Sequence, residues 1–185
     1  MFGLFKRKKS SKSLEVSSLQ MDLRSAVAPL LKLNGSLSDQ LGECYGELDH
    51  NPAELRFFSM AATSVFVQSF GKLPQEKMQA LVGMFYEHSA ANSLLYMPRA
   101  DFSVVYAAAT QRFGVYADLI MRVINANTED AQGDANTSLI TILDEYAKVE
   151  RGAFDRSLAG LMICSSLVDH AVQVKDAVEA VRGAF

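Results

Sequence analysis

Apolar residues recur at intervals of three and four along most of this 185-residue chain, and this helical period restricts the fold more than any other feature. After Pro98 the period places one apolar face on a single helix, formed by Phe102, Val105, Ala109, Phe113, Tyr116, Ile120 and Val123. No segment combines apolar–polar alternation with bounding turn residues, as a half-buried strand does. The sequence therefore predicts an all-α fold.

Prolines mark several expected helix boundaries. Asn51-Pro52 predicts an N-cap residue followed by proline in the first turn. We expect further helix starts at Pro74 and Pro98. Pro29 interrupts an apolar run and predicts a kink or a restart, because proline removes a backbone donor and clashes with the preceding turn.

Two segments in the middle of the chain have contrasting compositions. Residues 53–70 are apolar on nearly all sides, which predicts a central helix that ends at Gly71 and places Phe66 in the core. Residues 125–136 contain turn formers and three acids but no large apolar residue. We therefore expect an exposed loop there, with helix resuming near Thr137.

The helical period continues to the C-terminus after a turn or kink at Arg151-Gly152. We expect the core face of this last helix to be formed by Phe154, Leu158, Leu161, Val168, Val172, Val178 and Val181. Together the segments predict a single-domain bundle of six or seven helices over residues 14–185. Residues 1–13 are expected to precede it as a basic, flexible tail.

The net charge of −3 is unevenly distributed along the chain. Residues 1–13 hold five basic side chains and no acid, which leaves 13 basic and 21 acidic side chains, a charge of −8, in the remainder. An acidic body argues against nucleic-acid binding by the bundle. Cys44 and Cys164 are expected to be reduced thiols, and no secretory signal or long uninterrupted apolar run is present. We expect a cytoplasmic protein.

The basic tail is the strongest candidate contact site in the sequence. Apolar residues stand directly before a basic cluster, and the candidate membrane or partner contacts are Phe2, Leu4, Phe5, Lys6, Arg7, Lys8, Lys9 and Lys12. Each basic residue near an anionic membrane contributes about 1 kcal/mol, so we expect weak contact with the inner membrane face. Three alternatives stay open: a solubilising end, a nucleic-acid contact, and an address read by a transport receptor.

The histidines and glycines form no recognisable catalytic or metal-binding pattern. Glu47 and His50 have the spacing of di-iron ligands, but the second such motif that those bundles need is absent. The sequence does not decide whether His88 and His170 meet across the bundle. It contains no nucleophile elbow, no phosphate-cradling glycine loop and no His-Glu-x-x-His motif. We predict no catalytic residue, no metal ligand and no cofactor.

Charged residues on two helices are expected to face solvent. Asp144, Glu145 and Glu150 form an acidic cluster, and Lys148 lies four residues after Asp144. We interpret this cluster as a solvated face with an exposed ion pair. Asp118 and Arg122 are expected to form a similar pair.

These observations favour a non-enzymatic cytoplasmic protein that binds another macromolecule. The expected partner is a protein, with a membrane-associated adaptor or regulator as one form of this role. The 11 Phe, 6 Tyr and 8 Met residues support an alternative, a binder or sensor of small apolar ligands with a pocket between helices. A metal-dependent helical-bundle enzyme is the least favoured class. The oligomeric state stays open.

Overall fold

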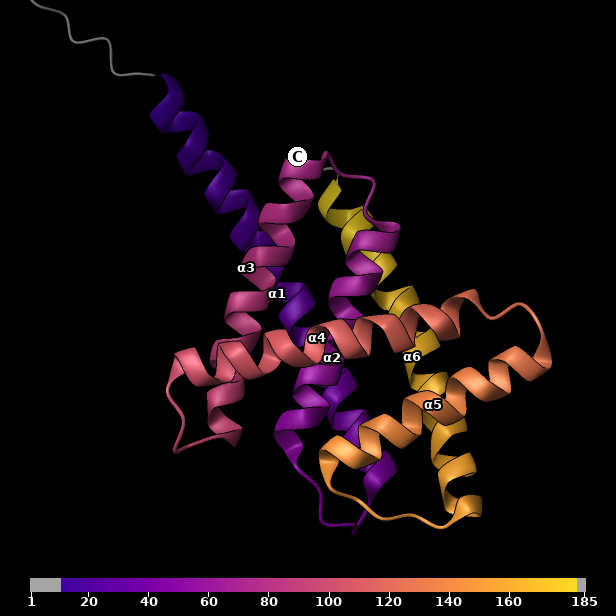
Figure 1. The fold of residues 1–185 in the computed structure, drawn as a ribbon. Helices are drawn as coiled ribbons and strands as arrows, with labels where there is room; N and C mark the ends of the chain where they lie inside the picture. The colour runs from indigo at the N-terminus through magenta and orange to yellow at the C-terminus, as the bar shows by residue number, and fades with distance from the viewer. Residues whose placement is uncertain (1–10, 183–185) are drawn as a thin grey trace, which may run out of the picture.

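A computed structural model describes the backbone of residues 11–182 and the side chains of residues 23–153 and 155–180 (Figure 1). The described chain contains six α-helices, one short 3₁₀ helix and no strand. The α-helices are α1 (Ser11–Tyr45), α2 (Pro52–Phe70), α3 (Gln75–Ser93), α4 (Phe102–Asn125), α5 (Glu129–Ala147) and α6 (Ala153–Arg182), and the 3₁₀ helix is η1 (Leu94–Tyr96). The predicted all-α bundle is confirmed.

Helix α2 is the centre of the bundle, as its apolar sequence predicts. It packs against α1, α3, α4, α5 and α6, and α4 crosses it in Figure 1. Phe58 and Phe66 are 0% and 2% exposed, so the predicted core position of Phe66 is confirmed. The polar residues Ser59 and Thr63 are also buried, and their hydroxyls donate to the backbone oxygens of Asn34 and Ser59, respectively.

The ends of α2 follow the local signals in the sequence. The Asn51 side chain accepts a hydrogen bond from Ala53 N at 3.1 Å, and Pro52 occupies the first helical position. The Gly71 amide donates to Val67 O at 2.8 Å and ends the helix. Both predicted boundaries are confirmed.

Two other predicted helix starts are shifted. Helix α3 begins at Gln75, one residue after Pro74. Helix α4 begins at Phe102 rather than at Pro98, because the Asp101 carboxylate accepts from Val104 N at 3.0 Å and provides a cap that proline cannot. The predicted start at Pro98 is wrong.

Helix α1 continues through Pro29 as one α-helix from Ser11 to Tyr45, so the alternative of a restart at this proline is wrong. The neighbouring residues Val27 and Leu30 are 2% and 1% exposed. Each buried side chain of this kind contributes roughly 1.5–3 kcal/mol. This packing is of the same order as the cost of about 3 kcal/mol for proline inside a helix.

The predicted loop at residues 125–136 is largely helical. Thr128 caps α5 by accepting from Ala131 N at 3.2 Å, and Glu129 and Asp130 occupy the first turn. Acidic side chains at this end stabilise a helix through its dipole. The polar composition therefore reflects an exposed helical start, and the prediction of a loop after Thr128 is wrong.

The predicted core face of α4 is confirmed in its centre and differs at its ends. Val105, Ala109, Tyr116 and Ile120 are buried, whereas Phe102 is 44% exposed. On the opposite side, Arg122 Nη2 lies 2.7 Å from Asp118 Oδ2 in the predicted exposed ion pair.

Most of the described part of the predicted core face of α6 points to solvent instead, and the side chains of Phe154 and Val181 lie outside the described residues. Leu158, Leu161, Val168 and Val172 are exposed, although Val178 is buried as predicted. The residues that face the core are Ala159, Ile163, Leu167, His170, Val174 and Val178. The prediction is wrong because α6 is apolar on two sides, and only one side packs against α1, α2 and α5.

Candidate functional site

The N-terminal contact residues predicted from the sequence fall almost entirely outside the described chain. The positions outside it are Phe2, Leu4, Phe5, Lys6, Arg7, Lys8 and Lys9. Lys12 lies in the first turn of α1, where only the backbone is described. The contact role of the tail therefore stays a prediction.

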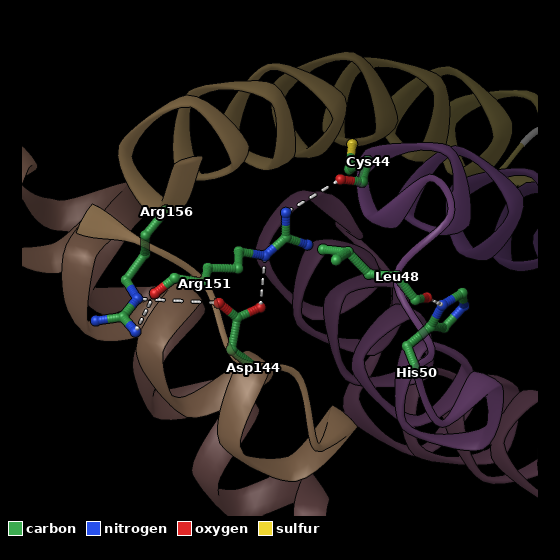
Figure 2. A network of polar contacts seen from close by, with 6 residues as sticks. All are labelled: Cys44, Leu48, His50, Asp144, Arg151 and Arg156. Carbon is green, nitrogen blue, oxygen red and sulfur yellow. Dashed lines mark hydrogen bonds and ion pairs between the residues drawn. The ribbon is translucent and has the colours of Figure 1, made fainter. Parts of the chain in front are cut away.

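A buried ion pair fixes the turn between α5 and α6 (Figure 2). Arg151 Nε donates to Asp144 Oδ1 at 3.1 Å, and the two side chains are only 5% and 3% exposed. Arg151 Nη1 also reaches Cys44 O at 3.4 Å, and the guanidinium carbon lies 4.3 Å from the centre of the Tyr45 ring. Arg151 thereby links the α5–α6 turn to the end of α1.

This arrangement corrects the prediction for the acidic cluster. Asp144 is 2% exposed, so it does not belong to a solvated face, and its partner is Arg151 rather than Lys148. Lys148 ends α5 with a φ of +62°, in the left-handed region. This turn brings Val149 N to Asp144 O at 2.9 Å and lets the chain place Arg151 over the carboxylate.

Arg156 approaches Asp144 from the first turns of α6. Its Nε lies 4.0 Å from Asp144 Oδ2, and its Nη2 donates to Arg151 O at 3.3 Å. Figure 2 shows Asp144 facing both arginines. The contacts of Arg156 thus hold the start of α6 against the α5–α6 turn. Separately, Asn51 N donates to Ala147 O at 3.0 Å and ties the α1–α2 connection to the end of α5.

A second buried network connects α2 with α4. Arg112 Nε donates to both carboxylate oxygens of Glu54, at 3.2 and 3.1 Å, and Tyr116 Oη donates to Glu54 Oε2 at 2.9 Å. The Arg112 guanidinium carbon lies 3.7 Å from the centre of the Tyr146 ring on α5. Burial, followed by the nearby Glu54 charge, raises the pKa of Tyr116 far above its usual value. Both buried carboxylates are thus paired with arginine, and neither is a free acid–base group.

The outer side of α6 carries a row of exposed apolar side chains, which we call the α6 stripe. Its members are 45–65% exposed: Leu158, Leu161, Met162, Val168 and Val172. Their spacing of three, four and seven residues keeps them on one helical face, opposite the buried side. The segment from Ser157 to Val168 contains no charged residue, but the longer uncharged run over residues 57–71 is mostly buried in α2, so the sequence alone does not mark this surface as exposed.

The same helix is long and apolar enough to cross a membrane when judged by length and composition alone. Over Asp155–Ala180 its best window has a mean hydropathy of 1.3, and 33% of that window is buried in the bundle. Core helices of soluble proteins meet the same criterion, so this property does not decide where the protein resides.

The three histidines do not form a common site. His50 lies in the α1–α2 connection, where its Nδ1 is 2.8 Å from Leu48 O. His88 is exposed on α3, whereas His170 is buried and its Nε2 lies 2.8 Å from Thr63 Oγ1. Within the described residues, no group of three or more His, Cys, Asp or Glu side chains could hold a metal ion.

Both cysteines are free and partly buried. Burial raises the pKa of Cys164 to about 11 and also raises the pKa of Cys44. The thiolate is the nucleophilic form of cysteine, so burial disfavours nucleophilic chemistry at either position.

Comparison with known protein families, curated proteins and solved structures found no match to this chain.

Proposed function

We propose that this chain is a non-enzymatic cytoplasmic protein that binds a protein partner through the α6 stripe. The observation that supports the proposal is the row of large apolar side chains, each 45–65% exposed, on a single helical face. Contiguous apolar surfaces on otherwise soluble proteins mark interaction sites. A stripe with helical spacing suits an amphipathic partner helix, which presents apolar anchors at the same intervals.

The composition of the stripe resembles the centre of a protein interface. Interface centres are depleted of charged residues and are more apolar than the rest of the surface. The run from Ser157 to Val168 meets the first condition, and Met162 and two leucines meet the second. Charged residues stand at its borders, with Arg156 before the run and Asp169 after it.

The buried ion pair at the α5–α6 turn supports a preformed surface. Asp144, Arg151 and Arg156 hold the first turns of α6 in place, and Ile163, Leu167 and Val174 anchor its inner side in the core. A rigid surface loses less conformational entropy on binding than a mobile one. The stripe therefore needs little reordering to accept a partner.

Charge favours a protein partner over an anionic membrane for this surface. The chain after residue 13 carries a formal charge of −8, whereas α6 itself is close to neutral, with four acidic and three basic residues. An anionic membrane surface repels such a body, whereas basic residues at the rim of a protein partner complement it.

The test compares partner capture by three versions of the full chain. Leu161→Lys combined with Val168→Lys adds two charges to the stripe, and Gln173→Lys combined with Ala180→Lys adds the same charge to exposed α6 positions outside it. We expect the stripe variant to lose a protein that the wild type and the control retain, as measured by quantitative mass spectrometry. Equal retention by all three versions contradicts the proposal.

The tail supports a separate proposal of weak contact with anionic membranes. Phe2, Leu4 and Phe5 supply apolar side chains, and the adjacent basic residues supply charge attraction. We expect the full chain to co-sediment with phosphatidylserine vesicles more than a chain that lacks residues 1–13. If both versions co-sediment equally, the tail does not bind the membrane.

A further inference from the structure

The charges of α6 are unevenly distributed along its outer side. Asp169, Asp176 and Glu179 are exposed, and none of them forms an ion pair within the described chain. At about 100° per residue, these three acids lie within the angular range of the α6 stripe, whereas Lys175 lies just outside it. The C-terminal half of the outer side is therefore acidic, although α6 as a whole is close to neutral.

The N-terminal half of the same surface is apolar. Leu158, Leu161 and Met162 are 45–65% exposed, and no charged residue occurs from Ser157 to Val168. Apolar surfaces are covered by apolar side chains, and charged surfaces attract residues of the opposite charge. A segment that covers the whole surface must therefore be apolar at one end and basic at the other.

The N-terminal tail of this chain has the required order of side chains. Three large apolar residues stand directly before four consecutive basic residues, and these are Phe2, Leu4 and Phe5, followed by Lys6, Arg7, Lys8 and Lys9. The tail carries a charge of +5, whereas the rest of the chain carries −8. Charges of opposite sign steer two such surfaces together. The tail and the outer side of α6 are thus complementary in both polarity and charge.

The lengths of the two surfaces also agree. An extended chain spans about 3.3 Å per residue, so Phe2–Phe5 and Lys6–Lys9 each extend over about 10 Å. A helix rises about 1.5 Å per residue, so Leu161–Val168 and Asp169–Asp176 each extend over about 10 Å as well. When the apolar residues of the tail lie on Leu161–Val168, its basic residues therefore lie beside Asp169 and Asp176.

The position of α1 favours the tail of a second copy over the tail of the same molecule. The first turns of α1 project from the bundle in Figure 1, and Ser11 lies about 18 Å along the helix from the buried Leu23. Residues 1–10 span at most about 36 Å. A return along α1 leaves about 18 Å of this length, which is less than the roughly 22 Å from Asp176 to Leu161. Helix α1 instead carries the tail outward, where another molecule can bind it.

We infer that the N-terminal tail of a second copy of this chain docks on the α6 stripe. Its apolar residues cover the apolar half of the surface, and its basic residues pair with the acidic half. Two copies that exchange tails cover both stripes and form a closed, symmetric dimer. This inference rests on the proposed function, because it names a second copy as a partner of the same stripe.

Sedimentation velocity of the full chain tests the pairing by charge reversal. Lys6→Glu with Lys9→Glu reverses two charges of the tail, and Asp169→Lys with Asp176→Lys reverses two charges of α6. We expect the wild type to form dimers by about 200 μM. Each double variant should raise the dimer Kd about tenfold or more, and the combination of all four changes should return the Kd close to the wild-type value.

A matched control separates the pairing from a change in net charge. Glu87→Lys with Asp134→Lys changes the net charge as much as the α6 variant does, at exposed positions on α3 and α5, and should leave the dimer Kd unchanged. Leu161→Lys with Val168→Lys disrupts the apolar half of the surface and should give a monomer. Circular dichroism confirms that each variant keeps its helicity.

Photo-crosslinking locates the tail on the partner molecule. The crosslinker p-benzoylphenylalanine is introduced at Phe5 of the full chain, and ¹⁵N-labelled and unlabelled chains are mixed before irradiation. We expect mass spectrometry to find crosslinks from position 5 to residues 158–172, including crosslinks that join a labelled chain to an unlabelled one.

The inference is overturned if the wild type is monomeric up to about 200 μM, or if the combined variant dimerises no better than the two double variants. It is also overturned if position 5 crosslinks only within one chain, or never to α6. A monomeric wild type whose stripe still retains another protein in the capture experiment leaves the proposed function standing. Conversely, a stripe-dependent dimer supports the inference even if capture of other proteins is equal for all three versions.

Discussion

The burial of His170 predicts that the stability of the bundle is sensitive to mild acid. His170 is 3% exposed on α6, its Nε2 lies 2.8 Å from Thr63 Oγ1 on α2, and its ring is 5.9 Å from the Phe66 ring. Burial lowers the pKa of His170 from the ordinary 6.5 to about 4 in the folded protein. A proton on this ring would place a charge between α2 and α6, where the described contacts are apolar apart from one hydroxyl.

The sign and size of the effect follow from the difference between the folded and unfolded pKa values. As the pH falls below 6.5, the unfolded chain takes up a proton that the folded protein does not accept until about pH 4. The contribution of neutral His170 is therefore complete above pH 6.5, decreases as the pH falls, and is fully lost below pH 4. The total loss is about 3 kcal/mol, and about 2 kcal/mol of it falls between pH 7 and pH 5.

Urea unfolding at pH 7, 6 and 5 measures this dependence. His170→Gln replaces the titrating ring with a neutral side chain, and His88→Gln makes the same change at an exposed position on α3. Because the carboxylates titrate in every version, the informative quantity is the difference between the pH slopes. We expect the wild type and His88→Gln to lose about 2 kcal/mol more than His170→Gln between pH 7 and pH 5. Equal slopes for all three proteins refute the reasoning.

Further predictions concern the ion pair, the α5 cap, the core and the α6 stripe, all measured by urea or thermal unfolding. Arg151→Met leaves the buried Asp144 carboxylate without its main partner and should cost about 3–5 kcal/mol. The double variant Arg151→Met with Asp144→Asn should lose less stability than the sum of the losses in the two single variants. Additive losses would contradict the pairing. Lys148→Gly should stabilise the fold by roughly 0.5–1 kcal/mol, because glycine adopts a φ of +62° without strain; a lower melting temperature argues against this. Phe66→Ala should cost about 3–5 kcal/mol, and an unshifted melting curve argues against a central α2. Leu161→Lys should change stability by less than about 0.5 kcal/mol, since its side chain is 65% exposed, and a large loss means that the stripe supports the core.

Local signals explain where the sequence predicts the fold correctly. Asn51 and Gly71 act on backbone groups within a few residues, so the ends of α2 can be recognised without knowledge of the tertiary structure. The apolar composition of residues 53–70 likewise allows only a central position. These features do not depend on which helix packs against which.

The errors arise where the correct answer depends on distant contacts. The start of α5 contains few apolar residues, but Thr128 caps it and two acidic residues occupy its first turn. The helix then continues into a segment whose buried Leu139 and Leu143 anchor it in the core. The partner of Asp144 lies seven residues away across a left-handed turn at Lys148, so helical spacing alone does not identify it. The face of α6 that enters the core is equally undetermined, because both sides are apolar.

The two-sided character of α6 connects the stability of the bundle to its proposed partner. The inner side carries His170 and the apolar anchors of the core, and the outer side carries the α6 stripe. A partner that binds only the folded helix stabilises the protein by about 2.7 kcal/mol when its concentration is 100 times the Kd. This gain is as large as the loss of about 2 kcal/mol that His170 causes between pH 7 and pH 5. If the proposed partner binds the α6 stripe, we therefore expect the partner-bound protein to tolerate acid that weakens the free protein.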